Sequence, residues 1–344
     1  MRYITLRIGG VQASVLGFGC AAIMGRCGRR ESLRALNAAL DGGITFFDTA
    51  RSYGYGESES VVGDFLQGRR DRVVLSTKFG IVPNWQPRWK RSLMPALRAI
   101  LEVAPSARNL IRTQVKSQLK ENQLTVKVLR ESLEESLRRL HTDYVDILFM
   151  HAAPASALAQ SDLLNELEKL IVAGKIRMAG ISSEPEVIAS ALKARLPVLR
   201  AMQFPVNLFD LRMTQAHSVA QTKDLVFVAN HPFGGVGRVQ ETKARLRNFA
   251  AMPSIPVELR RKLNSSGDGL LSDVILNLIL TNTGIQIALP SMMNESHLKD
   301  NIQSITNSRF TGEELNWIRG HFSDGVSVNE LHPASAVNAH ASYR

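Results

Sequence analysis

The chain has 344 residues, of which 44% are hydrophobic and 21% are charged, a composition typical of a globular enzyme with a sizeable core. Its two cysteines, Cys20 and Cys27, form neither a disulfide framework nor a zinc spacing, which favours a reducing, cytoplasmic compartment. The sequence shows no signal-peptide pattern and no apolar run of about 18 residues, so we expect no membrane partner.

The net charge of +11 is concentrated in one segment, because residues 81–122 hold eight basic and only two acidic side chains. Within it, Arg108, Arg112, Lys116 and Lys120 recur every four residues, which places them on one helix face. Two interpretations stay open: a solvated basic helix, or a helix that borders the active site and attracts an anionic ligand. No nucleic-acid partner is expected, because only 6% of the residues are aromatic and no nucleic-acid-binding motif occurs.

Strand-like and helix-like segments alternate along the chain. Short apolar runs predict eight strands, over residues 15–19, 45–48, 73–78, 144–150, 176–181, 199–203, 225–230 and 285–289. Periodic segments predict eight helices, over residues 30–41, 57–66, 126–140, 161–173, 184–192, 214–221, 270–281 and 295–304. Repeated strand–helix units give a parallel sheet, and eight of them favour an α/β fold of the (β/α)8 TIM-barrel type.

Three segments fall outside this repeat. Gly9 and Gly10 lie between two short extended runs, which indicates an N-terminal β-hairpin that plugs the bottom of the barrel. Residues 81–122 are interpreted as a helical insertion after the third strand, and residues 323–344 as a mobile tail. Because no linker divides the chain, we expect residues 1–344 to form a single domain.

Polar side chains recur where the predicted strands end, which is the edge of a (β/α)8 barrel that carries the active site. Any one of them is explained by a turn, a cap or a structural hydrogen bond, but their joint placement favours a functional site. In chain order they are Asp48, Lys78, His151, Ser182, Ser183, Gln203, Asn230 and His231, with Tyr53 in the turn after the second strand.

Four of these groups suit proton transfer to a carbonyl oxygen while a hydride reaches the carbon. The ordinary pKa of a phenol is about 10, and a Lys78 ammonium would stabilise the Tyr53 phenolate and lower that pKa. Asp48 would keep Lys78 charged and in place. His151 would donate a hydrogen bond to the substrate oxygen or relay a proton.

Six segments together resemble the aldo-keto reductase superfamily. They are FFDTARSYGYGESE (46–59), STKFG (76–80), VDILFMH (145–151), GKIRMAGISS (174–183), QFPVN (203–207) and LPSMMNESHLKDN (289–301), and they cover nearly the whole chain in family order. The resemblance implies an oxidoreductase that interconverts a small aldehyde, ketone or sugar carbonyl and its alcohol. It implies a catalytic tetrad with Tyr53 as the proton donor, formed by Asp48, Tyr53, Lys78 and His151.

The resemblance also implies a coenzyme, NADPH or NADH with NADP slightly favoured, bound across the barrel mouth without a metal. Its contacts would be Gly19, Cys20, Ser182, Ser183, Gln203, Asn230, His231, Pro232, Phe233, Gly235, Ser291, His297 and Asn301. Trp85 and Phe209 are the candidate walls of the substrate pocket.

Three departures from the family pattern concern this coenzyme. Ser183 replaces a common Asn, and Asn230 replaces an aromatic residue that stacks on the nicotinamide. Ser291 and His297 stand where NADPH-specific members place Lys and Arg for the 2′-phosphate, which leaves the coenzyme preference open. The cations available as substitutes are His297, Arg238 and Lys243.

Two alternatives compete with this interpretation. Residues 17–22, GFGCAA, fit the G-x-G-x-x-A pattern of a dinucleotide-binding fold, but Gly25 and Gly28 interrupt the helix that such a motif must open. The superfamily also includes β subunits of potassium channels, so the alternative function is a cofactor-binding redox regulator with little turnover. The intact pair of Tyr53 and Lys78 favours an enzyme.

Overall fold

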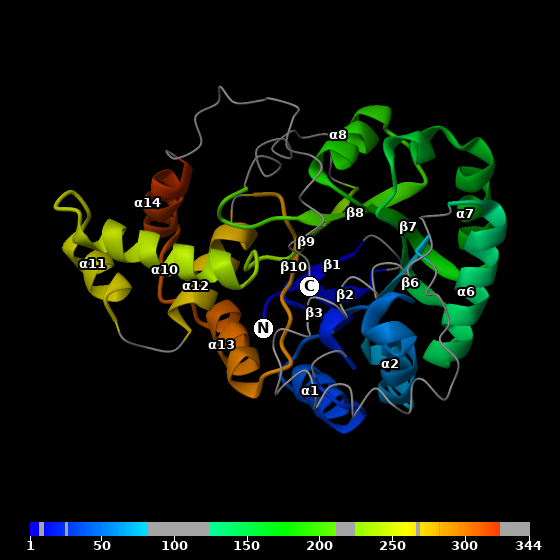
Figure 1. The fold of residues 1–344 in the computed structure, drawn as a ribbon, viewed down its shortest axis with the longest axis horizontal. Helices are drawn as coiled ribbons and strands as arrows, with labels where there is room; N and C mark the ends of the chain where they lie inside the picture. The colour runs from blue at the N-terminus through cyan, green and yellow to red at the C-terminus, as the bar shows by residue number, and fades with distance from the viewer. Residues whose placement is uncertain are drawn as a thin grey trace, which may run out of the picture.

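Eight parallel strands form one sheet whose order around the molecule is the order of the chain (Figure 1). The computed structural model describes residues 1–6, 10–24, 27–81, 124–210, 224–265, 269–281 and 283–323. The strands are β3 (Gly17–Gly19), β4 (Phe46–Asp48), β5 (Val74–Phe79), β6 (Val145–His151), β7 (Ile176–Ser182), β8 (Leu199–Pro205), β9 (Val226–Asn230) and β10 (Ile287–Leu289). All eight predicted strands are confirmed within two residues at each end.

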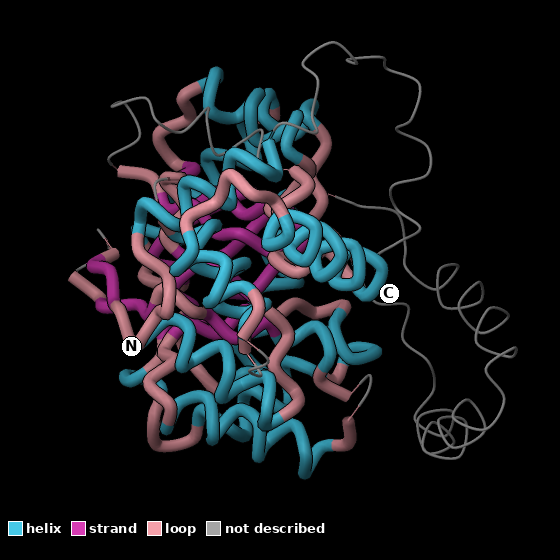
Figure 2. The backbone as a smooth tube through the Cα atoms, turned by 90° about the vertical axis from the view of Figure 1, so that its left-hand side faces the viewer, coloured by secondary structure: helices cyan, strands magenta, loops and turns pink. Residues whose placement is uncertain are grey.

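Hydrogen bonds between the chain segments of β3 and β10, the first and last strands of the sheet, close it into a barrel. Leu16 forms a parallel bridge with Ala288, and the backbone N–H of Gly19 donates to the carbonyl of Pro290 over 3.2 Å. Figure 2 shows the strands in the interior with helices around them. The predicted (β/α)8 TIM-barrel fold is confirmed.

The helices of the repeat agree with the sequence prediction wherever the structure describes them. They are α1 (Arg29–Asp41), α2 (Ser58–Leu66), α6 (Val126–Leu140), α7 (Ser161–Val172), α8 (Pro185–Ala194), α12 (Leu270–Leu280) and α13 (Glu295–Thr306). Within the described ranges, three further α-helices were not predicted, namely α10 (Val236–Ala251), α11 (Val257–Leu263) and α14 (Gly312–Ser323). The predicted helix over 214–221, the basic insertion and the tail beyond residue 323 lie outside the described residues. No helix in the described ranges is both long enough and apolar enough to cross a membrane.

Helix α6 illustrates how local sequence sets these boundaries. The Thr125 hydroxyl accepts a hydrogen bond from the backbone N–H of Val128, which caps the first turn. Leucines at positions 129, 133, 137 and 140 then bury one face of the helix. The helix ends at His141, whose φ of 51° is left-handed.

Alternate strand residues point into the barrel, as the period of two requires. The inward residues pack into one buried cluster, formed by Phe46, Val74, Ile147, Phe149, Met178, Ala201, Val226, Val228, Ile287 and Leu289 together with Leu6 and Ala13. Leu6 follows β1 (Tyr3–Thr5) and Ala13 lies within β2 (Gln12–Ser14), and these two strands form an antiparallel hairpin. This hairpin therefore closes the barrel at the end where the strands begin, as predicted.

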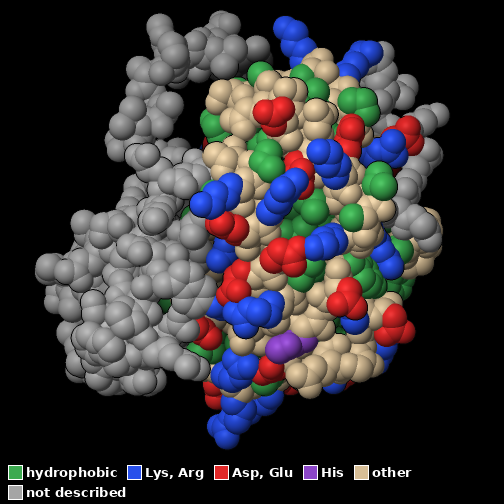
Figure 3. All heavy atoms as spheres, turned by 90° about the vertical axis from the view of Figure 1, so that its right-hand side faces the viewer, with side chains coloured by type: hydrophobic (Ala, Val, Ile, Leu, Met, Phe, Trp, Pro, Cys, Tyr) green, Lys and Arg blue, Asp and Glu red, His purple; other side chains and the backbone are tan. Residues whose placement is uncertain are grey.

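Ion pairs join neighbouring elements on the outside of the barrel. On the side shown in Figure 3, where α6 and α7 lie, basic and acidic side chains are intermixed. Arg130 of α6 makes a bidentate pair with Glu166 of α7, with N–O distances of 2.6 and 2.7 Å.

A buried aspartate holds β5, β6 and β7 together near their first residues. The Asp146 carboxylate is fully buried and accepts hydrogen bonds from the guanidinium groups of Arg70 (2.7 Å) and Arg177 (2.8 Å) and from the backbone N–H of Leu75 (2.9 Å). Both guanidinium groups also lie on the Tyr144 ring, 4.0 and 4.3 Å from its centroid. This end of a barrel is where structural rather than catalytic residues gather.

We expect Asp146→Asn to lower the free energy of unfolding by about 1–3 kcal/mol, because an amide of the same size loses the charge that two arginines bind. Urea unfolding followed by circular dichroism measures the effect. Asp143→Asn, on an exposed side chain of the preceding turn, is the matched control and should leave the midpoint unchanged. Equal midpoints for the two variants would contradict this role of Asp146.

Candidate active site

The alternate strand residues that face the barrel interior are mostly apolar along the strands and polar at the strand ends. Asp48 follows Phe46 by two residues, and His151 follows Phe149 by two, so both continue the inward row into the barrel mouth. The same phase places Lys78, Ser182, Gln203 and Asn230 on the inner face of their strands. The strand register sets Asp48 opposite Ser76 and His151 opposite Ser182.

A buried ion pair forms the base of the site. Lys78 is 1% exposed and Asp48 is 3% exposed, and Lys78 Nζ lies 2.6 Å from Asp48 Oδ2 and 3.0 Å from the carbonyl oxygen of Thr49. The other carboxylate oxygen, Oδ1, accepts hydrogen bonds from Ser76 Oγ (2.7 Å) and Gln203 Nε2 (3.0 Å). Burial alone would lower the pKa of Lys78, but Asp48 and Tyr53 raise it above its ordinary value, so the ammonium is charged at neutral pH.

Tyr53 lies over this pair on a short 3-10 turn, η2 (Tyr53–Gly56), between β4 and α2. Lys78 Nζ is 4.5 Å from the centroid of the Tyr53 ring. Burial raises the pKa of Tyr53 above its ordinary value, and Lys78 offsets only part of that rise. The predicted lowering of this pKa is therefore wrong in its net direction, although Lys78 acts as expected. The phenol keeps its proton at neutral pH, which is the form that a proton donor needs.

His151 faces Tyr53 from the end of β6. The two rings meet edge to face, with centroids 6.0 Å apart and planes at 87°. Burial and the nearby Lys78 ammonium lower the pKa of His151 to about 3. The imidazole is therefore neutral at physiological pH. Of the two predicted roles, hydrogen-bond donation from its N–H fits this state, whereas relay through an imidazolium does not.

This shift predicts a component of stability that depends on pH. The folded protein holds His151 with a pKa of about 3 instead of the ordinary 6.5, so the unfolded chain binds the extra proton first. Stability from this residue is complete above pH 6.5 and is lost as pH falls from there toward 3, with a slope of at most about 1.4 kcal/mol per pH unit. Urea unfolding at stepped pH should show a shallower decline for His151→Gln. Identical slopes for the two proteins would exclude a lowered pKa for His151 in the folded protein.

The predicted nicotinamide contacts are linked to this ion pair by hydrogen bonds. Ser182 Oγ donates to Gln203 Oε1 over 2.6 Å, and Gln203 donates in turn to Asp48. Ser183 differs, because its hydroxyl donates to the carbonyl of Ala153 over 2.7 Å, beside the end of β6. The structure therefore brings Ser182 and Gln203 into contact with the predicted tetrad, while Ser183 supports the next loop.

Two further segments carry predicted coenzyme contacts. The first runs from Asn230 to Gly235, where Gly234 and Gly235 have φ of 65° and 90° and α10 begins with no side-chain cap. The backbone N–H groups of its first turn can therefore bind an anion such as a pyrophosphate. The second segment includes Asn301 of α13, which is 2% exposed and whose Oδ1 has no hydrogen-bond partner in the described part of the chain. An orphaned buried acceptor and a glycine-rich helix start fit the adenine and phosphate ends of a dinucleotide.

The remaining predicted residues have the following places. Gly19 ends β3 and Cys20 begins the 3-10 turn that follows it. Cys20 is fully buried, which raises the pKa of its thiol. His231 and Pro232 follow β9, and the side chain of His231 contacts Asn230 Oδ1 at 3.0 Å. Ser291 and His297 are both exposed and Phe233 is partly buried. Trp85 lies outside the described residues.

Phe209, a predicted wall of the substrate pocket, lies between two helices that the sequence did not predict. Its ring centroid is 4.6 Å from the Arg238 guanidinium and 4.9 Å from that of Arg245, both on α10. It also meets Phe322 of α14 edge to face at 6.0 Å. The Phe209 ring is therefore packed between α10 and α14.

Sequence reasoning missed Ser76 and Thr49, which hold the two charges of the buried pair. Ser76 had a usable signal, because it lies two residues before Lys78 and so shares its inward phase. Thr49 acts through its backbone carbonyl, for which the side-chain sequence carries no signal.

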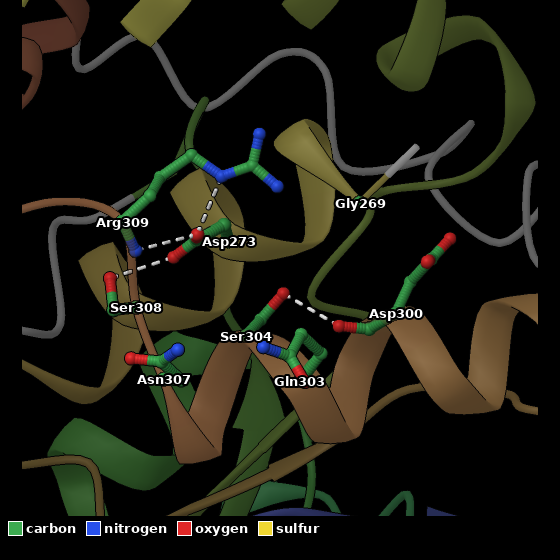
Figure 4. Close-up of a pocket in the computed structure, with 8 residues that line it drawn as sticks. All are labelled: Gly269, Asp273, Asp300, Gln303, Ser304, Asn307, Ser308 and Arg309. Carbon is green, nitrogen blue, oxygen red and sulfur yellow. Dashed lines mark hydrogen bonds and ion pairs between the residues drawn. The ribbon is translucent and has the colours of Figure 1, made fainter. Parts of the chain in front are cut away.

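A separate cavity of about 270 Å³ lies between α12 and α13 (Figure 4). Asp273 of α12 fills one side of it with hydrogen bonds to Ser308 and Arg309, and Asp300 and Gln303 of α13 form the other side. None of the predicted catalytic residues lines this cavity. Among the described residues, no set of three or more His, Cys, Asp or Glu side chains could hold a metal ion.

The comparisons with known proteins decide the family. Residues 15–322 match the family model described as the aldo/keto reductase family. The chain belongs to this family of oxidoreductases. Aldo-keto reductase YhdN of Bacillus subtilis (strain 168) is 31% identical over 222 residues, which are 63% of this chain and 57% of that protein, so the match spans little more than half of that relative. The uncharacterized oxidoreductase YqkF of the same strain is 24% identical over 95% of this chain and 98% of its own.

Solved structures agree with this aldo/keto reductase fold. The holo form of aldo-keto reductase AKR11C1 from Bacillus halodurans superposes with a TM-score of 0.67 at 23% identity, covering 96% of this chain and 99% of that one. An aldo-keto reductase from Klebsiella pneumoniae in complex with NADP and acetate gives a TM-score of 0.63 at 23% identity, covering 93% and 94% of the two chains.

Proposed function

We propose that this aldo/keto reductase is a single-domain, cytoplasmic enzyme that interconverts a small aldehyde, ketone or sugar carbonyl and its alcohol. The observation that carries the proposal is the buried pair of Lys78 and Asp48 beneath Tyr53, with the neutral His151 opposite. One charge pair, one phenol and one imidazole meet at the mouth of the barrel. A purely structural cluster would need no proton donor beside the ion pair.

Each residue of the predicted tetrad has a separate role in proton transfer. A nicotinamide coenzyme, when bound, supplies or accepts the hydride. Tyr53 donates its proton to the carbonyl oxygen, and the Lys78 ammonium stabilises the phenolate that is left. Asp48 keeps Lys78 charged, and the N–H of His151 binds the substrate oxygen beside Tyr53. Alcohol oxidation uses the same groups in reverse, with the Tyr53 phenolate as the base.

We propose NADP as the favoured coenzyme, with NAD as the alternative. The helix start at Gly235 would hold the pyrophosphate, Asn301 the adenine, and Ser182 with Gln203 the nicotinamide carboxamide. The NADP complex of the Klebsiella pneumoniae relative supports the preference. Ser291 supplies no positive charge for a 2′-phosphate, so exposed His297, or Arg238 or Lys243 on α10, would have to supply it.

Titration of the purified protein with NADPH and with NADH, followed by fluorescence, tests the first part of this proposal. Absorbance assays with aldehydes, ketones and sugars then test turnover. Binding with turnover supports the enzyme and measures the coenzyme preference. Binding without any turnover would favour a redox regulator, and failure to bind either nucleotide would refute the proposal.

A further inference from the structure

The turn that carries Tyr53 has an unfavourable backbone conformation, which contacts within the turn alone do not stabilise. Gly54, Tyr55 and Gly56 follow one another with φ of 57°, 56° and 83°, all in the left-handed region. For Tyr55 this conformation is strained, because its Cβ crowds the following carbonyl. At Gly54 any side chain would collide with the carbonyl oxygen of Ile23. Contacts from outside the turn must therefore fix its shape.

Helix α6 supplies such contacts on both sides of Tyr53. After it, Arg139 Nη1 donates to the carbonyl oxygen of Gly56 over 2.7 Å. Before it, Arg51 Nη1 donates to Ser132 Oγ over 2.9 Å. Ser132 and Arg139 are seven residues apart, two helical turns, and so lie on the same face of α6. Both arginines are largely enclosed, since Arg51 is 8% exposed and the Arg139 side chain 10%.

The same group of residues also touches the strand that carries Lys78. Glu59 of α2 is 1% exposed and accepts a hydrogen bond from Thr77 Oγ1 over 2.7 Å, directly beside Lys78. Burial raises the pKa of Glu59, while Thr77, Arg51 and Arg139 act in the opposite direction. The charges of the two arginines thus face a carboxyl that is fastened to β5.

We propose that Arg139 is a positioning residue for catalysis: from α6 it holds the Gly56 carbonyl and thereby keeps the Tyr53 hydroxyl within reach of Lys78. This inference rests on the function proposed above. Arg139 acts through the turn, by its hydrogen bond to the Gly56 carbonyl. Its orientation is fixed in turn by Glu135, whose Oε1 accepts from Arg139 Nε over 2.6 Å.

The neighbouring residue provides a matched control. Arg138 also pairs with Glu135, through N–O distances of 2.7 and 2.9 Å, but its side chain is 69% exposed and these hydrogen bonds go to Glu135 rather than to the turn. Arg138→Ala and Arg139→Ala therefore both remove an arginine from Glu135. Only Arg139→Ala removes the hydrogen bond to the turn.

We expect Arg139→Ala to lower kcat by about 10- to 100-fold, because small displacements of a catalytic group cost rates of this size. The dissociation constant for NADPH should stay within about twofold, since none of the predicted coenzyme contacts lies in the turn. Arg138→Ala should match the unmodified protein in both measurements. Arg139→Lys keeps the cation and one donor, and should recover part of kcat.

A readout without coenzyme separates positioning from general stability. Ultraviolet difference titration of the coenzyme-free protein, with Tyr53→Phe as the reference, reports the pKa of this phenol. It should rise in Arg139→Ala, because Tyr53 moves away from the Lys78 charge, and stay unchanged in Arg138→Ala.

Each outcome bears on one proposal. If the unmodified protein has no turnover, the proposed function fails, while the titration still tests the positioning role. If the protein turns over but kcat and the pKa of Tyr53 are unchanged in Arg139→Ala, the positioning role is refuted. If Arg139→Ala does not fold, Arg139→Lys and Arg139→Met carry the test, and a lower melting temperature with normal kcat would likewise refute it.

Discussion

Tyr53→Phe is expected to lower kcat by about 10²- to 10⁴-fold, the usual contribution of a positioned acid or base. Phenylalanine keeps the ring that lies 4.5 Å from Lys78 Nζ and edge-on to His151. Only the hydroxyl is lost, so packing and coenzyme binding should stay nearly unchanged. Steady-state kinetics and NADPH fluorescence titration on the same preparation measure both quantities.

The chain offers a close control for this experiment. Tyr55 belongs to the same turn, but its side chain is 49% exposed. Tyr55→Phe removes an equivalent hydroxyl two residues away and should leave kcat close to normal. Near-normal turnover in Tyr53→Phe would reject Tyr53 as the donor, and equal losses in both variants would point to a general effect on the turn.

Lys78→Met is expected to abolish turnover and to lower the free energy of unfolding by about 3–5 kcal/mol. Methionine has a similar length and fills the same space, but it leaves the Asp48 carboxylate buried without its cation. Hydrogen bonds from Ser76 and Gln203 remain and offset only part of the loss. Urea unfolding at neutral pH measures the change.

A double variant separates the two effects of this substitution. Lys78→Met with Asp48→Asn buries no unpaired charge, so most of the lost stability should return. Turnover should not return, because the ammonium that stabilises the Tyr53 phenolate is still absent. A single variant as stable as the unmodified protein would show that the buried pair matters little for folding.

Much of this barrel could be predicted from the sequence, because the pattern that indicates each strand lies within a few consecutive residues. Apolar runs followed by Asp48, Lys78 and His151 mark the strand ends, and parallel strands bring such ends to one edge. The hydrogen bond between Gln203 and Asp48 was not predictable in this way, since 155 residues separate its partners and only barrel closure brings them together.

The features that were missed depend on burial and tertiary packing. Helix α10 has a glycine in its first turn and many charged residues, so its local signal is weak. Packing of Leu246 and Phe249 into the core stabilises it instead. The pKa of Tyr53 rises for the same reason, because sequence identifies the charged neighbour but does not measure how much water burial removes.

The closure between β3 and β10 has a consequence for synthesis on the ribosome. Because strand order follows chain order, residues 1–280 can align every strand except the last before β10 emerges. Until then β3 and β9 both present unpaired edges, at which nascent chains can join one another. Gly17 increases this exposure, because two of the three side chains nearest to it, Leu289 and Ile287, come from β10. Premature stops before residue 287 should therefore yield aggregates rather than smaller soluble barrels.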